Sequence, residues 1–455
     1  MTRIHPTPAT AGTAQTKNDP LKYQAERTLY DCPGYLAVAQ ASSGEHGRLA
    51  AALRRDALEI HTEKEIKYLF DLEGRVVREE TRSEYRFRGC SHQGSITRKG
   101  SRGLERARLS GDEVDALCRR AWQIASTLAD LVGNAEKVTR CHPPGTETLD
   151  NIRPILRKAA EWTPERLTGE TGRFARVYQP IPILPPDHYA SLVLQATEGC
   201  SFNTCTFCNL YRDLPFRVRD TETFDRHIRG ALAFHGAALY RMNTIFLGQA
   251  NALVTPQPRL ESLLTTLGKY VDFPDPDSEP RASWTAGQPL RFLGIGSFLD
   301  GFTGLKKSAD DYDRLRRLGL RRVYLGVESG SNRLLSWLKK PATTDDMLRT
   351  LNLLHEAGVR NDVILLVGAG GDKWANEHVE QSLEFLAKAP LESGDRVYLS
   401  NLVAYPETPY PEALAAIGSK ALTPDEMAEQ RDTLREGARE LGLQAVPYRV
   451  EPFIY

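Results

Sequence analysis

From residue 191 onward, short apolar runs alternate with longer segments in which apolar residues recur at helical spacing. The runs are nearly continuous in apolar residues, which is typical of strands that are buried on both faces of a parallel sheet. They cover residues 191–196, 244–248, 291–297, 322–327, 362–367 and 396–403. The amphipathic segments lie near residues 222–237, 257–270, 308–317, 344–357, 375–388 and 424–441. Six strand–helix units in this order predict an α/β fold over residues 191–441, a partial (β/α)6 barrel similar to a TIM barrel.

The chain before this barrel has a different pattern. Residues 66–72 alternate between apolar and polar positions and lead through a Glu-Gly turn into residues 75–77, which predicts a β-hairpin. Residues 84–88 predict a further strand. Ser110 followed by Glu113 is a capping-box signature, and it stands directly before a run of apolar residues at helical spacing. Strands and a long helix are therefore both expected in this region.

These patterns divide the rest of the chain into four parts. Residues 28–165 form an N-terminal α+β region of unknown role, and residues 166–190 form a linker rich in proline, glycine and charge. Residues 1–27 are predicted to be a disordered tail, and residues 442–455 a C-terminal tail. The sequence has no run of about 18 apolar residues and no apolar core of a signal peptide near its start. We therefore expect a cytoplasmic protein without a membrane segment.

The overall charge is balanced. Lys+Arg and Asp+Glu both number 59, so the formal net charge of zero does not favour binding to nucleic acid or to an anionic membrane. Residues 86–108 are locally basic and contain Arg86, Arg88, Arg98, Lys99, Arg102, Arg106 and Arg108. Such a cluster is able to receive a phosphorylated or nucleotide substrate. An exposed, charge-rich loop is the more common outcome for a segment of this kind.

The cysteines point to a metal centre. The chain has 7 cysteines, an odd count that argues against a disulfide framework, and Cys200, Cys205 and Cys208 fall on one short loop after the first predicted strand. The carboxyl end of a barrel strand is where α/β barrels place their active sites. Three thiolates on such a loop are able to hold one [4Fe-4S] cluster and leave one iron without a protein ligand. The alternatives are a zinc site, which usually needs a fourth ligand, or unpaired buried cysteines.

The segment Gly199–Cys208 resembles the cluster-binding loop of the radical S-adenosylmethionine (SAM) superfamily. Residues 190–415 as a whole are similar to the Elp3/MiaB/NifB-like branch of Fe-S oxidoreductases. The resemblance implies that the open iron chelates SAM and that the reduced cluster cleaves it. The resulting 5′-deoxyadenosyl radical would then abstract hydrogen from a substrate. The C-x4-C-x2-C spacing has one residue more than the C-x3-C-x2-C spacing that is commonest in the superfamily.

The resemblance also assigns SAM contacts to the ends of the barrel strands. Phe207 matches the aromatic residue beside the adenine, and Glu328 matches the carboxylate that hydrogen-bonds the ribose hydroxyls. Where the family has an acid for the SAM amino group, this chain has Gln249 and Asn251. The complete set of cofactor-binding candidates is Phe207, Gly248, Gln249, Asn251, Ser297, Glu328, Ser329 and Gly368. The alternative is an ordinary strand-end turn at each position and, for Glu328, a structural ion pair.

Other residues are candidates for roles beyond SAM binding. Asn401, Tyr405 and Tyr410 are candidate substrate contacts, and Arg212 follows the cysteines closely enough to act near the cluster or to lie in a solvated loop. Cys141 is the candidate hydrogen donor among the catalytic residues, although a lone cysteine is usually inert.

The function implied by the resemblance is that of a radical SAM enzyme with an unidentified small-molecule substrate. Such an enzyme takes its electron from an external donor of the flavodoxin or ferredoxin type. One alternative is a radical SAM enzyme that modifies tRNA or another nucleic acid, which the basic residues 86–108 would favour. Another alternative is a non-catalytic Fe-S protein that transfers electrons or acts as a sensor.

Overall fold

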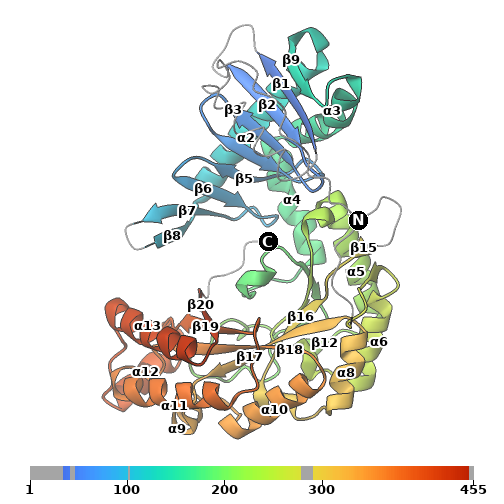
Figure 1. Ribbon diagram of the computed structural model, residues 1–455. Helices are drawn as coiled ribbons and strands as arrows, with labels where there is room; N and C mark the ends of the chain where they lie inside the picture. Colours follow the sequence, from blue (N-terminus) through green and yellow to red (C-terminus); the bar gives the residue numbers. More distant parts are fainter. Residues whose placement is uncertain (1–33, 41–46, 101–102, 278–289, 450–455) are drawn as a thin grey trace, which may run out of the picture. The chain divides into compact units, whose positions relative to one another are not determined.

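The computed structural model describes residues 34–40, 47–100, 103–277 and 290–449, and these residues form two compact units (Figure 1). Within the described ranges, the first unit runs to Arg173 and also contains residues 236–241. The second unit contains residues 174–235 and the chain from Met242 onward. The predicted tail over residues 1–27 and the cysteine at position 32 lie outside the described residues.

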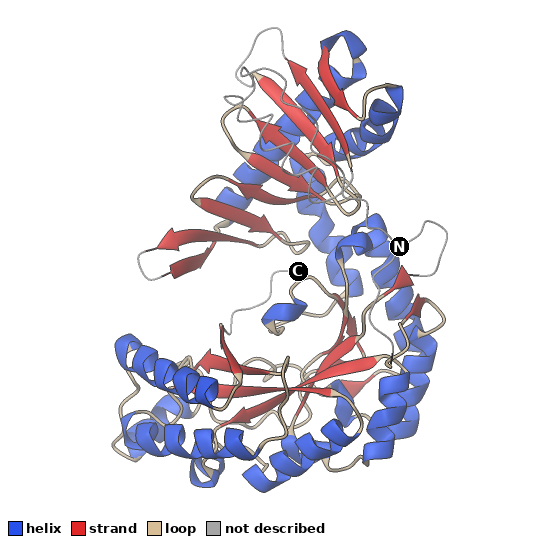
Figure 2. Ribbon diagram, viewed as in Figure 1, coloured by secondary structure: helices blue, strands red, loops and turns tan. Residues whose placement is uncertain are grey.

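The first unit is built on a 9-stranded antiparallel sheet with the strand order β8-β7-β6-β5-β4-β3-β2-β1-β9 (Figure 2). The strands are β1 Tyr35–Gln40, β2 Arg48–Leu53, β3 Leu58–Thr62, β4 Lys67–Phe70, β5 Val76–Glu80, β6 Glu84–Arg88, β7 Gly94–Gly100, β8 Gly103–Arg108 and β9 Val138–His142. The predicted hairpin is confirmed as β4 and β5, whose register pairs Lys67 with Glu80. The predicted strand over residues 84–88 is confirmed as β6.

Two long helices supply the core of this unit. Helix α2 (Gly111–Gly133) starts at the predicted capping box, in which the Ser110 hydroxyl accepts from the Glu113 N–H and the Glu113 carboxylate accepts from the Ser110 N–H. Helix α3 (Thr146–Glu161) packs beside it. Buried side chains of both helices, such as Leu117 and Ile152, form one apolar cluster with side chains of the sheet.

Helix α4 (Pro164–Val177) occupies the first part of the predicted linker. The prediction of an irregular segment was wrong there, because Leu167 and Phe174 lie two helical turns apart and are both buried. Glycine at positions 169 and 172 obscured this pattern in the sequence.

Six of the seven basic residues predicted over residues 86–108 lie on strands β6, β7 and β8 and not in a loop, and Arg102 lies outside the described residues. Arg86 and Arg98 both form ion pairs with Glu84 on β6. Arg88 is buried and donates to the Glu170 carboxylate at 3.0 Å.

The second unit contains a 7-stranded parallel sheet with the order β10-β13-β16-β17-β18-β19-β20. The strands are β10 Leu192–Gln195, β13 Ile245–Gly248, β16 Ile295–Leu299, β17 Leu320–Glu328, β18 Arg360–Val367, β19 Arg396–Asn401 and β20 Gln444–Tyr448. All six predicted strands are present and adjacent strands are parallel throughout. Strand β20 lies where the sequence suggested a C-terminal tail. Its Pro447 is tolerated because β20 is an edge strand that pairs with β19 alone.

Helices cover the outer face of this curved sheet (Figure 2). The six predicted helices are confirmed as α5 Thr221–His235, α6 Gln257–Leu267, α8 Ala309–Arg317, α10 Thr344–Glu356, α11 Ala375–Lys388 and α13 Pro424–Glu440. Three short helices follow strands β16, β17 and β19, namely α7 Gly301–Gly304, α9 Asn332–Trp337 and α12 Tyr410–Ala416. The unit is therefore a partial α/β barrel of the TIM type, as predicted. Within the described ranges, no helix is both long enough and apolar enough to cross a lipid bilayer.

The segment before β10 closes the amino-terminal end of the barrel. The Asp187 carboxylate accepts from the hydroxyls of Tyr324 at 2.5 Å and Tyr398 at 2.9 Å, and from the Arg396 guanidinium at 3.1 Å. Tyr324 and Tyr398 are inward-facing residues of β17 and β19 and are almost fully buried. With this end filled by side chains, the open end of the barrel is the one at the carboxyl ends of the strands.

Candidate active site

The cysteine loop begins at the carboxyl end of the first barrel strand. Two short antiparallel strands, β11 Thr197–Glu198 and β12 Arg217–Val218, close its base. Gly199 has a φ of +69°, and a Cβ there would lie 2.6 Å from the Leu214 carbonyl oxygen, so the tight turn requires glycine. The loop therefore leaves the sheet in a fixed direction.

Arg212 holds the loop from inside. Its guanidinium donates to the carbonyl oxygens of Cys208 at 2.7 Å and Cys205 at 3.0 Å. The Asn203 side chain donates to the Tyr211 carbonyl oxygen at 2.8 Å. The sequence left open a role near the cluster or a place in a solvated loop, and the guanidinium bonds the backbone of two of the cysteines. Arg212 is thus a positioning residue for the cysteines.

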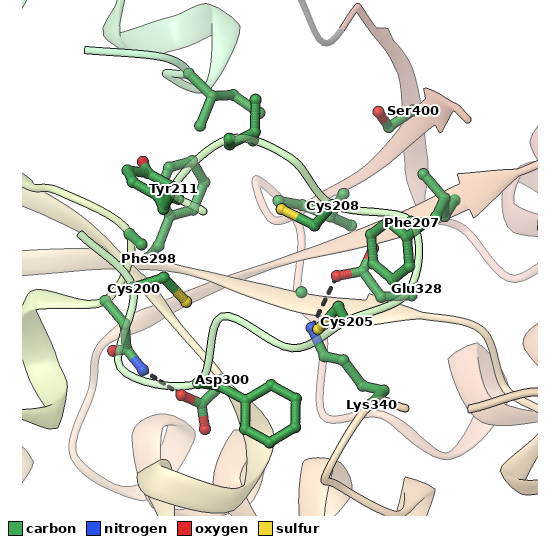
Figure 3. A pocket seen from close by; sticks show the side chains of 18 of the residues that line it. Cys200, Cys205, Phe207, Cys208, Tyr211, Phe298, Asp300, Glu328, Lys340 and Ser400 are labelled. Atoms are coloured by element: carbon green, nitrogen blue, oxygen red, sulfur yellow. Dashed lines mark hydrogen bonds and ion pairs between the residues drawn. The ribbon is translucent and has the colours of Figure 1, made fainter. Parts of the chain in front are cut away.

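Cys200, Cys205 and Cys208 line one cavity of about 220 Å³ at the open end of the barrel (Figure 3). Burial raises the pKa of the Cys205 thiol to about 11 and also raises the pKa of Cys208. Thiols with raised pKa values are protonated at neutral pH until a metal binds, and ligation then releases their protons.

The arrangement of the thiols bears on the kind of metal centre that they could hold. In the part of the chain that the structure describes, no three His, Cys, Asp or Glu side chains converge closely enough to ligate one metal ion. A zinc ion would require that convergence, because each sulfur must lie about 2.3 Å from it. Figure 3 shows the three cysteines around a common space. This donor set fits a larger group with several irons, which thiolates reach from different sides.

Glu328 and Lys340 form an ion pair on the wall of the same cavity. The Lys340 ammonium donates to Glu328 Oε1 at 2.8 Å, and the two side chains are 10% and 12% exposed. Burial alone lowers the pKa of Lys340, but Glu328, together with Cys205 and Asp300, outweighs the burial, so the net shift of the pKa is upward. Lys340 is therefore a charged ammonium group close to Cys205.

A local irregularity of β17 turns Glu328 toward the cavity. The β17–β18 register shifts between Gly326 and Glu328, and Glu328 has a left-handed φ of +64°. Bulges of this kind re-aim a side chain, and a non-glycine residue with positive φ is uncommon outside functional or strained sites. Glu328 lines the cavity and is also ion-paired, so the ribose contact implied by the resemblance stays a prediction beside the ion pair.

A second polar group lies at the ends of β13 and β16. The Asn251 amide donates to the Asp300 carboxylate and, at 3.1 Å, to the Thr303 hydroxyl. Asn251 Oδ1 is buried and has no hydrogen-bond partner within the described ranges. Asp300 directly follows β16 and lines the cavity beside Asn251. The acid expected after the second strand is absent from the sequence, and Asp300 after the third strand was not predicted.

Four of the other predicted SAM contacts are bonded elsewhere and do not line the cavity. All four are buried, Ser297 within β16 and the others directly after a strand, and each bonds a neighbouring segment. Their hydrogen bonds join Gln249 Oε1 to the Gly199 N–H at 2.6 Å, the Ser297 hydroxyl to the Leu247 carbonyl at 2.8 Å, the Ser329 hydroxyl to His378 Nδ1 at 2.8 Å, and the Gly368 N–H to Gln430 Oε1 at 2.7 Å. Gly248 precedes Gln249 and also lies away from the cavity wall.

The remaining candidate residues also divide into those that line the cavity and those that do not. Phe207, Asn401 and Tyr405 line the cavity. Tyr410 does not, because its buried hydroxyl accepts from the Gly370 N–H at 2.9 Å and donates to a backbone carbonyl. Cys141 lies on β9 of the first unit, where it is half-buried, and it is not one of the residues that line the cavity.

Comparison with known proteins identifies the barrel. Residues 194–386 match the family model described as the radical SAM superfamily. The solved structures that resemble the chain include coproporphyrinogen III oxidase (HemN) from Escherichia coli, with 16% identity, a TM-score of 0.38, and coverage of 60% of this chain and 56% of that one. The radical SAM methyltransferase TsrM from Kitasatospora setae has 19% identity, a TM-score of 0.35, and coverage of 51% and 39%.

A third similar structure is the archaeal Elp3 from Methanocaldococcus infernus, with 14% identity, a TM-score of 0.36, and coverage of 56% of each chain. The chain thus spans between 39% and 56% of the length of these three structures. No curated protein matches the sequence. The family assignment therefore rests on the match over residues 194–386.

Proposed function

We propose that Cys200, Cys205 and Cys208 hold the [4Fe-4S] cluster of this chain. The premise is that residues 194–386 place the chain in the radical SAM superfamily, so that it is an enzyme of the radical SAM class. When bound, the cluster and SAM supply a 5′-deoxyadenosyl radical that removes a hydrogen atom from the substrate. The observation that carries the proposal is that the three thiols share one cavity with the Glu328–Lys340 ion pair at the open end of a parallel barrel.

The residues of the cavity have distinct parts in this proposal. Arg212 fixes the two later cysteines through their carbonyl oxygens, so the thiols keep their spacing. Lys340 places a positive charge close to Cys205 and favours an anionic centre there. The Glu328 carboxylate is suited to accept from a pair of neighbouring hydroxyls, such as those of a ribose. Asn251 and Asp300 offer a buried acceptor and a carboxylate for an ammonium group.

A small-molecule substrate agrees best with these observations. The nucleic-acid alternative drew on the basic residues 86–108, but Arg86, Arg88 and Arg98 are paired with carboxylates of their own unit. A simple electron carrier would have no use for a buried ion pair on the wall of a cavity, because such a pair is costly to desolvate. An external one-electron donor of the flavodoxin or ferredoxin type completes the proposal.

The test is anaerobic reconstitution of the full chain with iron and sulfide, followed by addition of SAM and dithionite. We expect about four irons per chain, an electron paramagnetic resonance signal after reduction, and 5′-deoxyadenosine in the product mixture. An intact, reducible cluster that forms no 5′-deoxyadenosine would overturn the proposed activity.

Two variants separate the cluster ligands from other cysteines. Cys205→Ala should lose the cluster absorption and the formation of 5′-deoxyadenosine. Cys118→Ala makes the same substitution in the core of the first unit, where Cys118 is fully buried, and should retain both. Retention of cluster and product by Cys205→Ala would disprove the ligand assignment.

A further inference from the structure

Both members of the ion pair lie at the ends of one segment. Glu328 is the last residue of β17, and Lys340 follows the short helix α9. Residues 329–340, the α9 segment, form a loop that the 2.8 Å bond between Lys340 and Glu328 closes. Its residues Leu334 and Leu338 are fully buried in an apolar cluster. The position of the ion pair therefore depends on how this segment is anchored.

Helix α11 anchors the first residues of the α9 segment. Three consecutive residues bond to side chains of α11, and the bonds join the Ser329 hydroxyl to His378 Nδ1 at 2.8 Å, the Gly330 N–H to the Ser382 hydroxyl at 2.9 Å, and the Ser331 hydroxyl to the Glu377 carboxylate at 2.6 Å. A Cβ at Gly330 would clash with the Gln381 carbonyl oxygen, so only glycine allows this close approach. The start of the segment is therefore fixed to a helix of the outer layer.

The cysteine loop contacts the other end of α9. Leu338 caps the carboxyl end of the helix, where carbonyl groups have no partner within the helix. Its carbonyl oxygen accepts from the Thr206 N–H at 3.1 Å and from the Thr206 hydroxyl at 3.2 Å. A carbonyl oxygen has two lone pairs and accepts both bonds together. Thr206 is 3% exposed and stands between Cys205 and Cys208, so the loop is joined to α9 between two of its cysteines.

One peptide group of the cysteine loop is held on both sides. The carbonyl of Cys205 accepts from the Arg212 guanidinium at 3.0 Å, and the N–H of the same peptide group, that of Thr206, donates to Leu338. Because a peptide group is planar, bonds to both of its polar atoms fix its orientation and the direction in which the Cys205 side chain leaves the backbone. Phe207 packs against the same apolar cluster as Leu338. The α9 segment therefore positions both Cys205 and the ion pair.

We propose that Thr206 is a positioning residue that holds Cys205, and with it the cluster, at a fixed place relative to the Glu328–Lys340 pair. Thr206 itself is not one of the residues that line the cavity. This inference rests on the proposed function, in which SAM would bind both to the open iron and to Glu328. A ligand that engages two groups together binds well only when those groups are held at the matching spacing. Removal of the Thr206 hydroxyl should therefore weaken SAM binding from outside the cavity.

The variant Thr206→Val tests the proposal, because it removes the hydroxyl and keeps the shape of the side chain and the backbone N–H. We expect the Kd for SAM to rise by about three- to tenfold, the effect of one lost hydrogen bond. The measurement is equilibrium dialysis of labelled SAM against the full chain with reconstituted, oxidised cluster. Iron content should not change, since all three thiols remain. Thr206→Ala removes the same hydroxyl without placing a methyl group against the carbonyl, and it decides the matter if the valine variant does not fold.

Two further variants control for the nature of the change. Thr206→Ser keeps the hydroxyl and should bind SAM within about twofold of the unsubstituted chain. Thr204→Val makes the valine substitution at an exposed position of the same loop, and it should leave the Kd and the iron content unchanged.

A double-variant cycle with Glu328→Gln separates positioning from a general loosening of the loop. In the Glu328→Gln chain one of the two contacts with SAM is already weakened, so the place of the cluster relative to it matters less. Addition of Thr206→Val should then raise the Kd by less than about twofold, because residues that act through one spacing have non-additive effects. A loosened loop that acts on the cluster alone would raise the Kd by the same factor in both backgrounds.

Three outcomes would overturn the positioning role. They are an unchanged Kd in both Thr206→Val and Thr206→Ala, an equal rise of the Kd with and without Glu328→Gln, and loss of iron, which would mean that Thr206 supports cluster binding itself. Formation of 5′-deoxyadenosine is measured on the unsubstituted chain. If it forms while the Thr206 variants bind SAM normally, the positioning role fails and the proposed function stands. If it does not form, the proposed function fails independently of the variants.

Discussion

The two units of this chain use buried charge in opposite ways. In the first unit, Arg75 donates to Asp71 at 2.6 Å and to Glu170 at 3.0 Å, and Arg88 donates to Glu170 at 3.0 Å. In the second unit, Glu328 and Lys340 pair on the wall of a cavity. The first group joins secondary-structure elements to each other, whereas the second faces space that a ligand can enter. Burial of charge alone therefore does not identify a functional site.

The two sheets also differ in where the charged residues of their strands lie. Strands of the first unit alternate charged and apolar residues, as in residues 84–88, and their arginines are neutralised by nearby carboxylates. Strands of the second unit are buried on both faces, so almost every charge in them is either at an end or next to the cavity. The comparison predicts that substitutions of buried charges will change stability in the first unit and ligand binding in the second.

The largest effect is expected for Glu170→Ala. Glu170 is fully buried and accepts from two arginines, so its removal leaves two buried cations without their shared partner. Breaking a buried ion pair in this way costs roughly 3–5 kcal/mol. The measurement is urea unfolding followed by hydrogen exchange of peptides from β4 to β7. Glu161→Ala, which removes an exposed ion pair with Arg166, should cost about 1 kcal/mol or less. Equal losses in the two variants would contradict the structural role of the buried network.

The variant Glu328→Gln tests the prediction that buried charge in the second unit affects ligand binding. The substitution keeps the shape of the side chain and removes a charge that Lys340 and, in the proposed function, SAM would both use. We expect the affinity for SAM to fall by about 10- to 100-fold, since hydrogen bonds to charged groups contribute about 1.5–3 kcal/mol. Iron content should stay the same. Equilibrium dialysis with labelled SAM measures the change, and Glu412→Gln on the exposed side of α12 is the control. Loss of the cluster in Glu328→Gln would assign the residue to cluster assembly instead.

The pH dependence of stability should also differ between the units, because three of the four buried histidines of the second unit have lowered pKa values. Burial lowers the pKa of His188 and His378 to about 4 and that of His227 to about 3. A histidine with a lowered folded-state pKa contributes full stability above its unfolded pKa of about 6.5, and this contribution is lost as the pH falls toward the folded value. Each histidine should therefore cost the barrel about 2 kcal/mol between pH 7 and pH 5.

The variant His378→Gln isolates one of these contributions. It should remove about 2 kcal/mol of the difference in stability between pH 7 and pH 5. Unfolding at pH 7.5, where the histidine is neutral in both states, gives the cost of the substitution itself. Asp362, whose pKa burial raises to about 6, acts in the opposite direction over this range, but it is common to both proteins. An identical pH slope in the variant would show that the pKa of His378 does not differ between the folded and unfolded states.

The sequence-based predictions of secondary structure were more accurate for the second unit than for the first. The six barrel strands and helices are recognisable because continuous apolar runs and helical periods occur in parallel sheets and rarely elsewhere. In the first unit, β1 and β2 are short and rich in alanine, as in Ala50–Ala52, and they carry little pattern. Strand β20 contains Pro447, which argues against a strand unless its edge position is known. These elements are determined by pairing with distant strands, which a local pattern does not contain.

A local sequence pattern was also insufficient to predict some single residues of the site. The cysteine spacing and Glu328 could be predicted because each is marked by its position at a strand end. Asp300 and Ser400 are equally close to strand ends, but their place on the cavity wall depends on the pleat and on neighbouring strands. Gln249 and Ser329 were predicted as SAM contacts, yet the Gln249 side chain bonds the start of the cysteine loop and the Ser329 side chain bonds helix α11. The direction of a side chain is thus the information that the sequence lacked.

The smallest effect, and the finest test of the comparison, concerns two predicted SAM contacts that the structure separates. Ser297 is fully buried and donates to the Leu247 carbonyl oxygen, whereas Asn251 lines the cavity with a buried oxygen that has no partner within the described ranges. Ser297→Ala should lower the free energy of unfolding by about 1 kcal/mol and leave the Kd for SAM unchanged. Asn251→Ala should raise that Kd by about five- to tenfold, because a ligand donor would lose its acceptor. Calorimetric titration of both reconstituted variants with SAM measures the difference. A raised Kd in Ser297→Ala alone would mean that the strand ends rearrange when SAM binds, so that residues bonded inside the barrel become part of the site.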